Sequence, residues 1–307
     1  MSAESAARSD SPTRCGYVAL IGAPNVGKST LLNRAVGSKV SIVSPKVQTT
    51  RSRVLGIIVE EAAQIIFVDT PGIFQPRRRL DRAMVHAAWQ GAADADLVAL
   101  LVDAKRGLDE ETAGILRALK DSGRSAILVI NKVDLVRRPT LLSLAQRLNA
   151  EFPFVETFMI SAETGDGVAD LLTHLARCLP EGPWLFPEDQ LTDVPMRLLA
   201  AEITREKLYL QLHEELPYAA TVETEAWETF ANGDVRIEQV IYVQRDGQKA
   251  IVLGKGGRRI KAIREAARAE LAETVATNVH LFLFVKVRER WIEDPERYRD
   301  WGLEFDA

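Results

Sequence analysis

GAPNVGKST, residues 22–30, decides the fold of the first half of the chain. It matches the pattern G-x-x-x-x-G-K-[ST] and stands between a predicted strand, YVALI at 17–21, and a predicted helix, KSTLLNRAVG at 28–37. The glycines let backbone N–H groups surround phosphate oxygens, and the helix N-terminus adds partial positive charge. The alternative is a glycine-rich turn without a ligand. We predict a phosphate-binding loop made of Gly22, Ala23, Pro24, Asn25, Val26, Gly27, Lys28, Ser29 and Thr30.

Short apolar runs that end in polar residues continue along the chain. VLGIIVE at 54–60 and QIIFVD at 64–69 look like paired strands. DLVALLVDA at 96–104, AILVI at 126–130 and TFMI at 157–160 are typical of buried parallel strands. This order predicts a doubly wound α/β domain whose ligand lies at the C-terminal ends of the strands.

Two polar segments suit a nucleotide with a γ-phosphate and Mg²⁺. Asp69 is expected to contact Mg²⁺ through a water, and the Gly72 N–H to reach the γ-phosphate, with Thr70 and Pro71 between them. The alternative for this tetrad is a turn that only ends a strand. SPKVQTTRSRV, residues 44–54, is polar and rich in Thr, as expected of a switch loop that supplies a Mg²⁺-ligating hydroxyl.

Thr50 is the predicted ligand from this loop, with Thr49 as its rival, because spacing cannot separate the two. We expect Ser29, Thr50 and Asp69 to hold the metal, and Lys28 to bind the β- and γ-phosphates. The predicted catalytic residues are Lys28, Thr50 and Gly72. Ile73 stands where Ras-like enzymes place a water-orienting Gln, which predicts slow intrinsic turnover.

Asn131, Lys132, Val133 and Asp134 follow the run AILVI and indicate the base. The Asp134 carboxylate offers two acceptors that match the N1–H and exocyclic amine of guanine, whereas adenine presents no such pair of donors. A P-loop ATPase or kinase is therefore disfavoured. After TFMI come three further predicted nucleotide contacts, among which the Ala162 N–H is expected to reach the guanine O6: Ser161, Ala162 and Glu163.

The whole chain has 307 residues, 47% of them hydrophobic, and a formal net charge of −4. This length suits two domains, and the charge requires any nucleic-acid contact to come from a local basic patch. The two cysteines have no metal or redox spacing and suit a reducing cytoplasm. We expect a disordered tail at 1–14, the α/β domain at 15–180, a proline-rich linker at 181–194 and a second domain at 195–301.

The second domain is predicted to run helix, strand, strand, helix, helix, strand. GKGGRRIKAIREAAR, residues 254–268, holds six basic side chains against one acidic one and places its apolar residues on one helical face. A KH fold uses such a GxxG loop to bring a nucleic-acid backbone close. The alternative is a solvated cationic helix after a glycine turn. The predicted RNA-binding residues are Gly254, Lys255, Gly256, Gly257, Arg258, Arg259 and Lys261.

The motifs QTTRSR, DTPGI, NKVD and GKGG, with the segment FPEDQLTDVPMRLLAAEITREKL, resemble the Era family of bacterial GTPases over roughly residues 15 to 301. The resemblance implies a Mg²⁺-dependent GTPase that binds 16S ribosomal RNA near its 3′ end through a KH domain. It also implies help in maturation of the 30S subunit, a cytoplasmic location and peripheral association with the inner membrane. We expect a monomer.

Two further points stay open at the level of the sequence. Asn25 resembles the residue that helps to hold K⁺ near the phosphates in related potassium-activated GTPases, although a turn former is the alternative. A signalling switch whose second domain binds a protein or a membrane is the rival to an RNA-binding assembly factor. RNA dependence of affinity and turnover separates these two functions.

Overall fold

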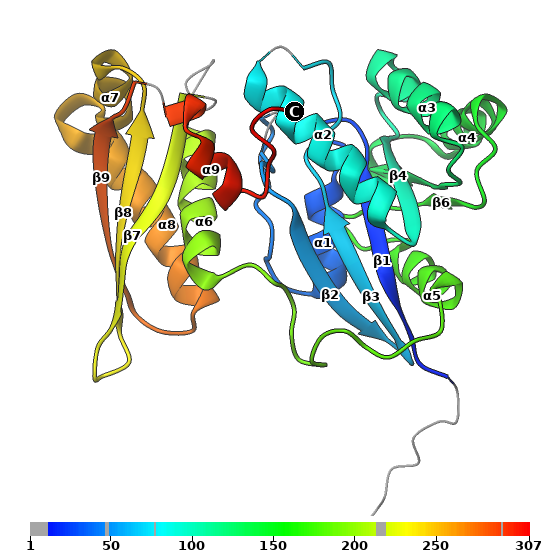
Figure 1. Ribbon diagram of the computed structural model, residues 1–307, viewed down its shortest axis with the longest axis horizontal. Coiled ribbons are helices and arrows are strands. Elements are labelled where there is room, and N and C mark those ends of the chain that lie inside the picture. The colour runs from blue at the N-terminus through cyan, green and yellow to red at the C-terminus, as the bar shows by residue number, and fades with distance from the viewer. Residues whose placement is uncertain (1–11, 47–48, 77, 213–218, 290) are drawn as a thin grey trace, which may run out of the picture.

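The computed structural model describes residues 12–46, 49–76, 78–212, 219–289 and 291–307. Within these ranges the strands form a six-stranded sheet, in the order β2-β3-β1-β4-β5-β6, and a separate three-stranded sheet, in the order β7-β8-β9. The two sheets lie in two domains side by side (Figure 1). This architecture confirms the predicted α/β domain followed by a smaller α+β domain.

The larger sheet places the polar ends of its strands on one edge. Its register aligns Leu20 with Asp69 and Asp103 with Asn131, so the residues that follow neighbouring strands lie close together. Strand β2 pairs antiparallel with β3, whereas the other neighbours pair in parallel. The strands are β1 (Arg14–Ile21), β2 (Val54–Glu60), β3 (Ala63–Asp69), β4 (Leu97–Asp103), β5 (Ile127–Asn131) and β6 (Thr157–Met159).

Helices cover both faces of this sheet. Helix α2 crosses the front of the sheet in Figure 1, whereas α1 lies behind it against β2 and β3. This alternation is what buried parallel strands require, because both of their faces are apolar. The helices are α1 (Lys28–Val36), α2 (Arg79–Asp94), α3 (Glu110–Ser122), α4 (Arg138–Glu151) and α5 (Val168–Cys178).

The start of β1 differs from the prediction. The strand was expected at Tyr17 and a tail was expected to reach residue 14, but parallel pairing with β3 already begins at Arg14. The Arg14 guanidinium donates to the Leu179 carbonyl oxygen at 2.5 Å, which ties this end of the strand to the end of the domain. Residues 1–11 of the expected tail lie outside the described residues.

The proline-rich linker follows the edge of the sheet. The Ile57 N–H donates to the Leu191 carbonyl oxygen at 2.9 Å, and the Thr192 hydroxyl donates to the Leu55 carbonyl oxygen at 2.7 Å. The Gln64 side chain accepts hydrogen bonds from the N–H groups of both Leu185 and Phe186. The bonds to Leu55 and Ile57 cover the open edge of β2, and together with those of Gln64 they hold the linker against the first domain.

The second domain has the predicted order of elements. Ile263, Ala267 and Leu271 are fully buried beneath its sheet, as their helical spacing indicates. The first of its two adjacent helices begins at Asp246, where Gln248 accepts the Arg245 N–H and caps the helix. The elements are α6 (Met196–Gln211), β7 (Ala220–Thr229), β8 (Val235–Val243), α7 (Asp246–Leu253), α8 (Arg258–Thr274) and β9 (Val279–Val287).

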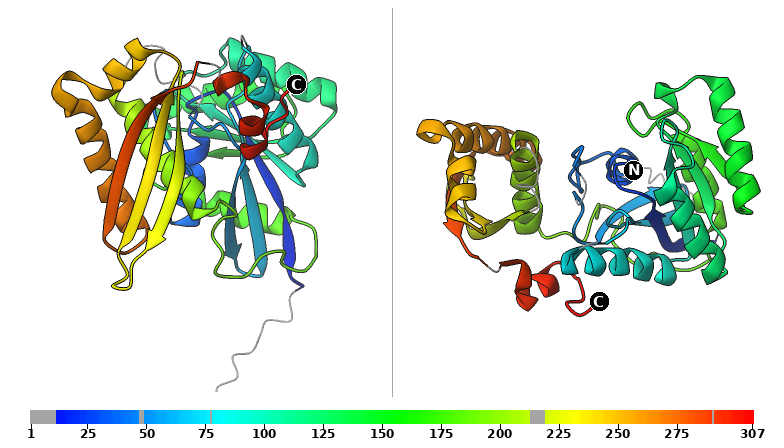
Figure 2. Two further views of the ribbon diagram at one scale, coloured as in Figure 1. Left: turned by 60° about the vertical axis from the view of Figure 1, so that its left-hand side comes forward. Right: turned by 90° about the horizontal axis from the view of Figure 1, so that it is seen from above.

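The last residues return to the first domain, which the sequence did not predict. After β9 the chain forms the short helix α9 (Pro295–Asp300) and reaches α2, as the view from above shows (Figure 2). Tyr298 and Leu303 are buried there against Leu80 and Met84 of α2. The two domains are therefore joined by the C-terminal segment as well as by the linker.

Candidate functional site

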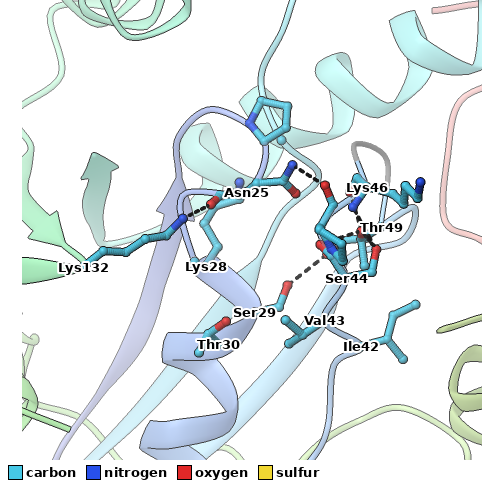
Figure 3. A pocket seen from close by; sticks show the side chains of 15 residues that line it. Asn25, Lys28, Ser29, Thr30, Ile42, Val43, Ser44, Lys46, Thr49 and Lys132 are labelled. Atoms are coloured by element: carbon cyan, nitrogen blue, oxygen red, sulfur yellow. Dashed lines mark hydrogen bonds between the residues drawn. The ribbon is translucent and has the colours of Figure 1, made fainter. Parts of the chain in front are cut away.

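A cavity of about 320 Å³ opens at the C-terminal ends of β1 and β3 (Figure 3). The phosphate loop forms one wall, and residues 42–46 together with Thr49 and Thr50 form the opposite wall. Ten of the residues that the sequence motifs single out line it, namely Pro24, Asn25, Gly27, Lys28, Ser29, Thr30, Thr49, Thr50, Gly72 and Lys132. The structure thus brings both switch segments to the predicted phosphate loop.

The glycines of the loop are required by its backbone. Gly22 and Gly27 have φ angles of 149° and 100°, and a Cβ atom on Gly27 would lie 2.3 Å from the Asn131 amide nitrogen. Asn25 has a φ of 63°, which Asn tolerates better than most residues. The Asn25 side chain donates to the Pro45 carbonyl oxygen at 2.9 Å and so connects the two walls of the cavity.

Lys28 is buried at the base of the cavity. Its Nζ donates to the carbonyl oxygens of Gly22 and Ala23, each at 3.1 Å. Burial lowers the pKa of the Lys28 ammonium to about 8, although the negative charge of Asp69 acts in the opposite direction. An incompletely solvated cation in this position attracts an anionic ligand strongly.

Asp69 lies in a cluster of hydroxyl groups. Its Oδ2 accepts from Ser29 at 2.6 Å and from Ser41 at 2.9 Å, and the Ser29 Oγ lies 3.0 Å from the Thr50 Oγ1. Burial raises the pKa of the Asp69 carboxyl, opposed by the bonds from these hydroxyls and by Lys28. The buried Oδ1 has no hydrogen-bond partner among the described residues.

The two threonines left open by the sequence point in different directions. The Thr49 hydroxyl donates to the Lys46 carbonyl oxygen at 2.6 Å and lies 2.6 Å from the Ser44 hydroxyl, within its own loop. The Thr50 hydroxyl faces Ser29 instead. The structure therefore places Thr50, rather than Thr49, beside the predicted metal-binding serine.

The start of the second switch segment is fixed against the phosphate loop. The Thr70 hydroxyl donates to the Leu20 carbonyl oxygen at 2.8 Å, and the Ile73 N–H donates to the Gly22 carbonyl oxygen at 3.0 Å. A Cβ atom on Gly72 would lie 2.9 Å from two atoms of Pro24. Glycine at position 72 therefore allows this segment to approach the phosphate loop more closely than a residue with a side chain would.

Of the residues expected to bind the base, Lys132 lines this cavity, whereas Asp134 and residues 161–163 lie outside its lining. Asp134 is exposed at the 3-10 turn η1 (Val133–Leu135). Lys132 donates to the Asn25 carbonyl oxygen at 2.6 Å and to Asp103 at 2.7 Å. The Ala162 N–H, expected to face the guanine O6, donates in this structure to the Asn131 Oδ1 at 2.9 Å.

The loop at 161–166 is stabilised by its own backbone and by α1. The Ser161 hydroxyl accepts from the Thr164 N–H at 3.2 Å. Arg34 donates to the carbonyl oxygens of Ala162 and Glu163. The expected contacts at positions 161–163 are thus at the same end of the sheet as Asp134, on a supported loop.

Sequence reasoning missed three residues that hold this site together. Ser41 donates to Asp69, Arg34 holds the loop after β6, and Arg106 donates to the Pro24 carbonyl oxygen at 3.1 Å. None of them belongs to a motif. Arg106 also pairs with Asp109 and Glu111, and its basic side chain after the strand ending at Asp103 was the one available signal.

The basic glycine loop of the second domain forms the 3-10 turn η3 (Lys255–Gly257) at the start of α8. Gly254, Gly256 and Gly257 all have φ between 62° and 74°. Lys255, Arg258 and Lys261 are exposed. Arg259 differs from this group, because it donates to the Ile251 carbonyl oxygen at 2.6 Å and so supports the end of α7.

The phosphate loop, the two switch segments and the NKVD motif on a doubly wound sheet define a P-loop GTPase, here followed by a KH domain. The GTPase Era of Afipia carboxidovorans is 64% identical over 294 residues, which cover 96% of each chain. The chain belongs to the GTPase Era family, and it binds GTP and hydrolyses it to GDP and phosphate.

Further comparisons agree with this assignment. The family of 50S ribosome-binding GTPases matches residues 17–132, and the KH domain family matches residues 215–292. The GTPase Era of Sinorhizobium medicae is 64% identical over 96% of this chain and 95% of its own.

Two solved structures are similar over the whole fold. An Aquifex aeolicus Era variant bound to GDP.AlF4- has a TM-score of 0.89 and 40% identity, covering 96% of this chain and 100% of that chain. Era in complex with MgGDPNP and nucleotides 1506–1542 of 16S ribosomal RNA has a TM-score of 0.90, with the same identity and coverage. The predicted family and fold are confirmed.

Proposed function

We propose that this GTPase binds small-subunit ribosomal RNA through its KH domain and assists maturation of the 30S subunit. The observation that carries the proposal is the exposed basic loop at the start of α8, where Lys255, Arg258 and Lys261 surround a glycine turn. Local cations of this kind bind phosphates despite the acidic balance of the chain. The 16S RNA bound to the solved relative supports the same choice of RNA.

Crosslinking in cells, followed by sequencing of the bound RNA, tests this function. A Gly254→Ala/Gly257→Ala variant should lose most of the crosslinks to small-subunit RNA. A Gly233→Ala variant is the matched control, because Gly233 also has a positive φ but lies in the turn between β7 and β8. Unchanged crosslinks in the double variant, or RNA unrelated to the small subunit, would contradict the proposal and favour a signalling switch.

The nucleotide site is proposed to hold Mg²⁺ with Ser29 and Thr50 as direct ligands and Asp69 as a ligand through water. Two hydroxyl oxygens 3.0 Å apart and a buried carboxylate oxygen without a partner suit a hard cation. Three or more His, Cys, Asp or Glu side chains do not form a metal-binding group anywhere in the described part of the chain. Phosphate oxygens would therefore complete the coordination, and the bound ion would neutralise charge on the phosphates.

Lys28 and Gly72 are the proposed catalytic partners of Thr50. Lys28 is held at the base of the cavity, where its ammonium can bind the β- and γ-phosphates. Gly72 packs on Pro24 of the phosphate loop, and its N–H is proposed to bind the γ-phosphate. Asn131 and Asp134 supply the proposed preference for guanine.

We infer that the nucleotide state is coupled to RNA binding. The loop that carries Thr50 lines the nucleotide cavity and also contacts the second domain, so ordering it by GTP can change the position of the RNA-binding loop. RNA affinity measured with GDP and with a nonhydrolysable GTP analogue tests this coupling. Equal affinities would remove it.

A potassium ion near the phosphates is proposed through Asn25. Its Nδ2 donates to the Pro45 carbonyl oxygen, which leaves the side-chain Oδ1 as the atom able to bind a cation. Hydrolysis should then be faster in KCl than in NaCl, and Asn25→Ala should abolish the difference.

The cytoplasmic location, the peripheral membrane association and the monomeric state stay predictions. Among the described residues, no helix is long and apolar enough to cross a bilayer.

A further inference from the structure

One face of α6, in the second domain, is directed at the loop that carries Thr50. Glu202, Arg205, Glu206 and Tyr209 are spaced i, i+3, i+4 and i+7, so they lie along a single stripe of this helix. Arg205, Glu206 and Tyr209 contact the first domain directly, and Glu202 holds Arg205. Their partners in the first domain are Lys39, Val43, Thr49 and Arg51. Figures 1 and 2 show α6 beside this loop in each view.

Arg205 makes the contact nearest to the proposed metal ligand. Arg205 is 1% exposed, and its guanidinium donates to the Thr49 carbonyl oxygen at 2.5 Å. Glu202 holds the same guanidinium through two further bonds, one of them at 2.8 Å, and the Tyr209 ring lies 5.0 Å from it. The orientation of Arg205 is therefore fixed by its own helix before it meets the first domain.

Arg51, on the other side of Thr50, is anchored in the second domain. Its guanidinium donates to the Tyr209 hydroxyl at 2.7 Å and to the Ala220 carbonyl oxygen at 3.1 Å. It also lies 5.6 Å from the Trp291 ring and 5.7 Å from the Trp301 ring. Both immediate neighbours of Thr50 are thus held by the KH domain, while Thr50 itself faces Ser29.

We propose that Arg205 is a positioning residue that holds Thr50 in place for Mg²⁺ and the γ-phosphate, so that the KH domain completes the metal site of the GTPase domain. The proposal rests on the assignment of Thr50 as a Mg²⁺ ligand under the proposed function. A switch loop that the second domain already holds loses less conformational entropy when the metal binds. By linkage, Mg²⁺ and GTP strengthen the contact between the domains to the same extent.

Loss of the contact between Arg205 and Thr49 should weaken binding of GTP with Mg²⁺ but not binding of GDP without Mg²⁺, which provides a test. Thr50 serves only the metal and the γ-phosphate, whereas GDP without Mg²⁺ depends on the phosphate loop and the base motif. Full-length Arg205→Met should raise the Mg²⁺ concentration for half-maximal GTP hydrolysis, and lower the affinity for MgGDPNP, by about tenfold, the effect of losing one charged hydrogen bond. Affinity for GDP in EDTA should stay within about twofold of the wild type.

Arg197→Met is the matched control, because Arg197 lies on the same helix but donates to Thr224 and Glu225 of its own domain. This variant should behave as the wild type in all three measurements. Glu202→Gln is a second variant in case Arg205→Met does not fold. It leaves the buried arginine in place and removes the charge of the carboxylate that pairs with it. It should show a smaller change in the Mg²⁺ requirement, in the same direction.

Thr50→Ala separates this inference from the proposed function beneath it. If Thr50→Ala leaves the Mg²⁺ requirement unchanged, the assignment of the metal ligand is wrong. If Thr50→Ala raises it but Arg205→Met and Glu202→Gln do not, the positioning role of Arg205 is wrong and the metal site stands. Equal losses of GDP and MgGDPNP affinity in Arg205→Met would also overturn the inference, because they would indicate general damage. When Arg205→Met is added to Thr50→Ala, it should cause no further change in the Mg²⁺ requirement.

Discussion

The side-chain amide of Asn131 donates to the Val26 carbonyl oxygen at 2.8 Å, so the motif expected to recognise the base also fixes the phosphate loop. The same side chain accepts the Ala162 N–H at 2.9 Å. Asn131 is 1% exposed and lies against Gly27, where no Cβ atom would fit. One buried amide therefore joins three segments of the nucleotide site.

Asn131→Ala should destabilise the protein as well as weaken nucleotide binding. It leaves a buried carbonyl oxygen and a buried N–H without partners, at about 1–3 kcal/mol each. Urea denaturation should show this loss in the free energy of unfolding, and GDP affinity should fall in parallel. Asn149→Ala is the control, because Asn149 is exposed on α4. A variant as stable as the wild type would contradict the structural role.

Asp134→Asn should change the choice of base without this loss of stability. Asp134 is exposed, and its carboxylate is expected to accept two hydrogens from guanine. An amide at this position offers one donor and one acceptor, which suits xanthine better. Competition binding should therefore show lower affinity for GTP and a gain for xanthosine triphosphate, with an unchanged unfolding curve. Equal affinity of the wild type for ATP and GTP would remove the basis of this prediction.

These two residues also show what the sequence could and could not predict. Asp134 and Asn131 belong to a motif whose place after a buried strand is set by local patterning, so their position at the sheet edge follows from the fold. The bonds of Asn131 to Val26 and Ala162 join segments distant in sequence, and no local spacing encodes them. Ser41 illustrates the same limit, because its contact with Asp69 depends on the path of a loop rather than on a motif.

Alanine substitutions at two glycines of the KH-domain loop should lower RNA affinity to different extents. A Cβ atom on Gly254 would lie 2.7 Å from the Arg259 Cβ, whereas one on Gly256 would meet nothing within 4 Å. Gly254→Ala should therefore distort the loop and lower RNA affinity by about tenfold or more, the effect of losing a phosphate contact or two. Gly256→Ala carries only the cost of its positive φ, about 1 kcal/mol. Filter binding at two salt concentrations measures both; equal losses would contradict the steric reasoning.

The contact between the domains was outside the reach of sequence patterns. Lys39 pairs with Glu206 at 2.6 Å and also with Glu270, and the Val43 N–H donates to Glu206 at 2.8 Å. Each of these side chains, taken alone, is typical of a solvated surface. Only the folded arrangement of the linker brings α6 and α8 against the switch loop and buries the carboxylate.

Because the Glu206 carboxylate is buried in the contact between the domains, we predict that this contact is sensitive to acid. Burial by itself raises the pKa of Glu206, but hydrogen bonds from Lys207, Lys39 and the Val43 N–H outweigh it and lower the pKa below the usual value of 4.5. The unfolded chain therefore binds more protons than the folded chain between the two pKa values. Stability from this group is complete above the unfolded pKa and is lost as the pH falls through the folded pKa.

Glu206→Gln should consequently cost most near neutral pH. The wild type should be the more stable protein at pH 7, and the difference in melting temperature should shrink as the pH falls below the usual glutamate pKa and then through the lower pKa of the folded state. Glu273→Gln, on the exposed side of α8, is the control and should leave the pH profile unchanged. A difference between wild type and Glu206→Gln that stays constant from pH 7 to pH 3 would show that the carboxylate is not the group that responds to acid, because the substitution would then act through packing alone.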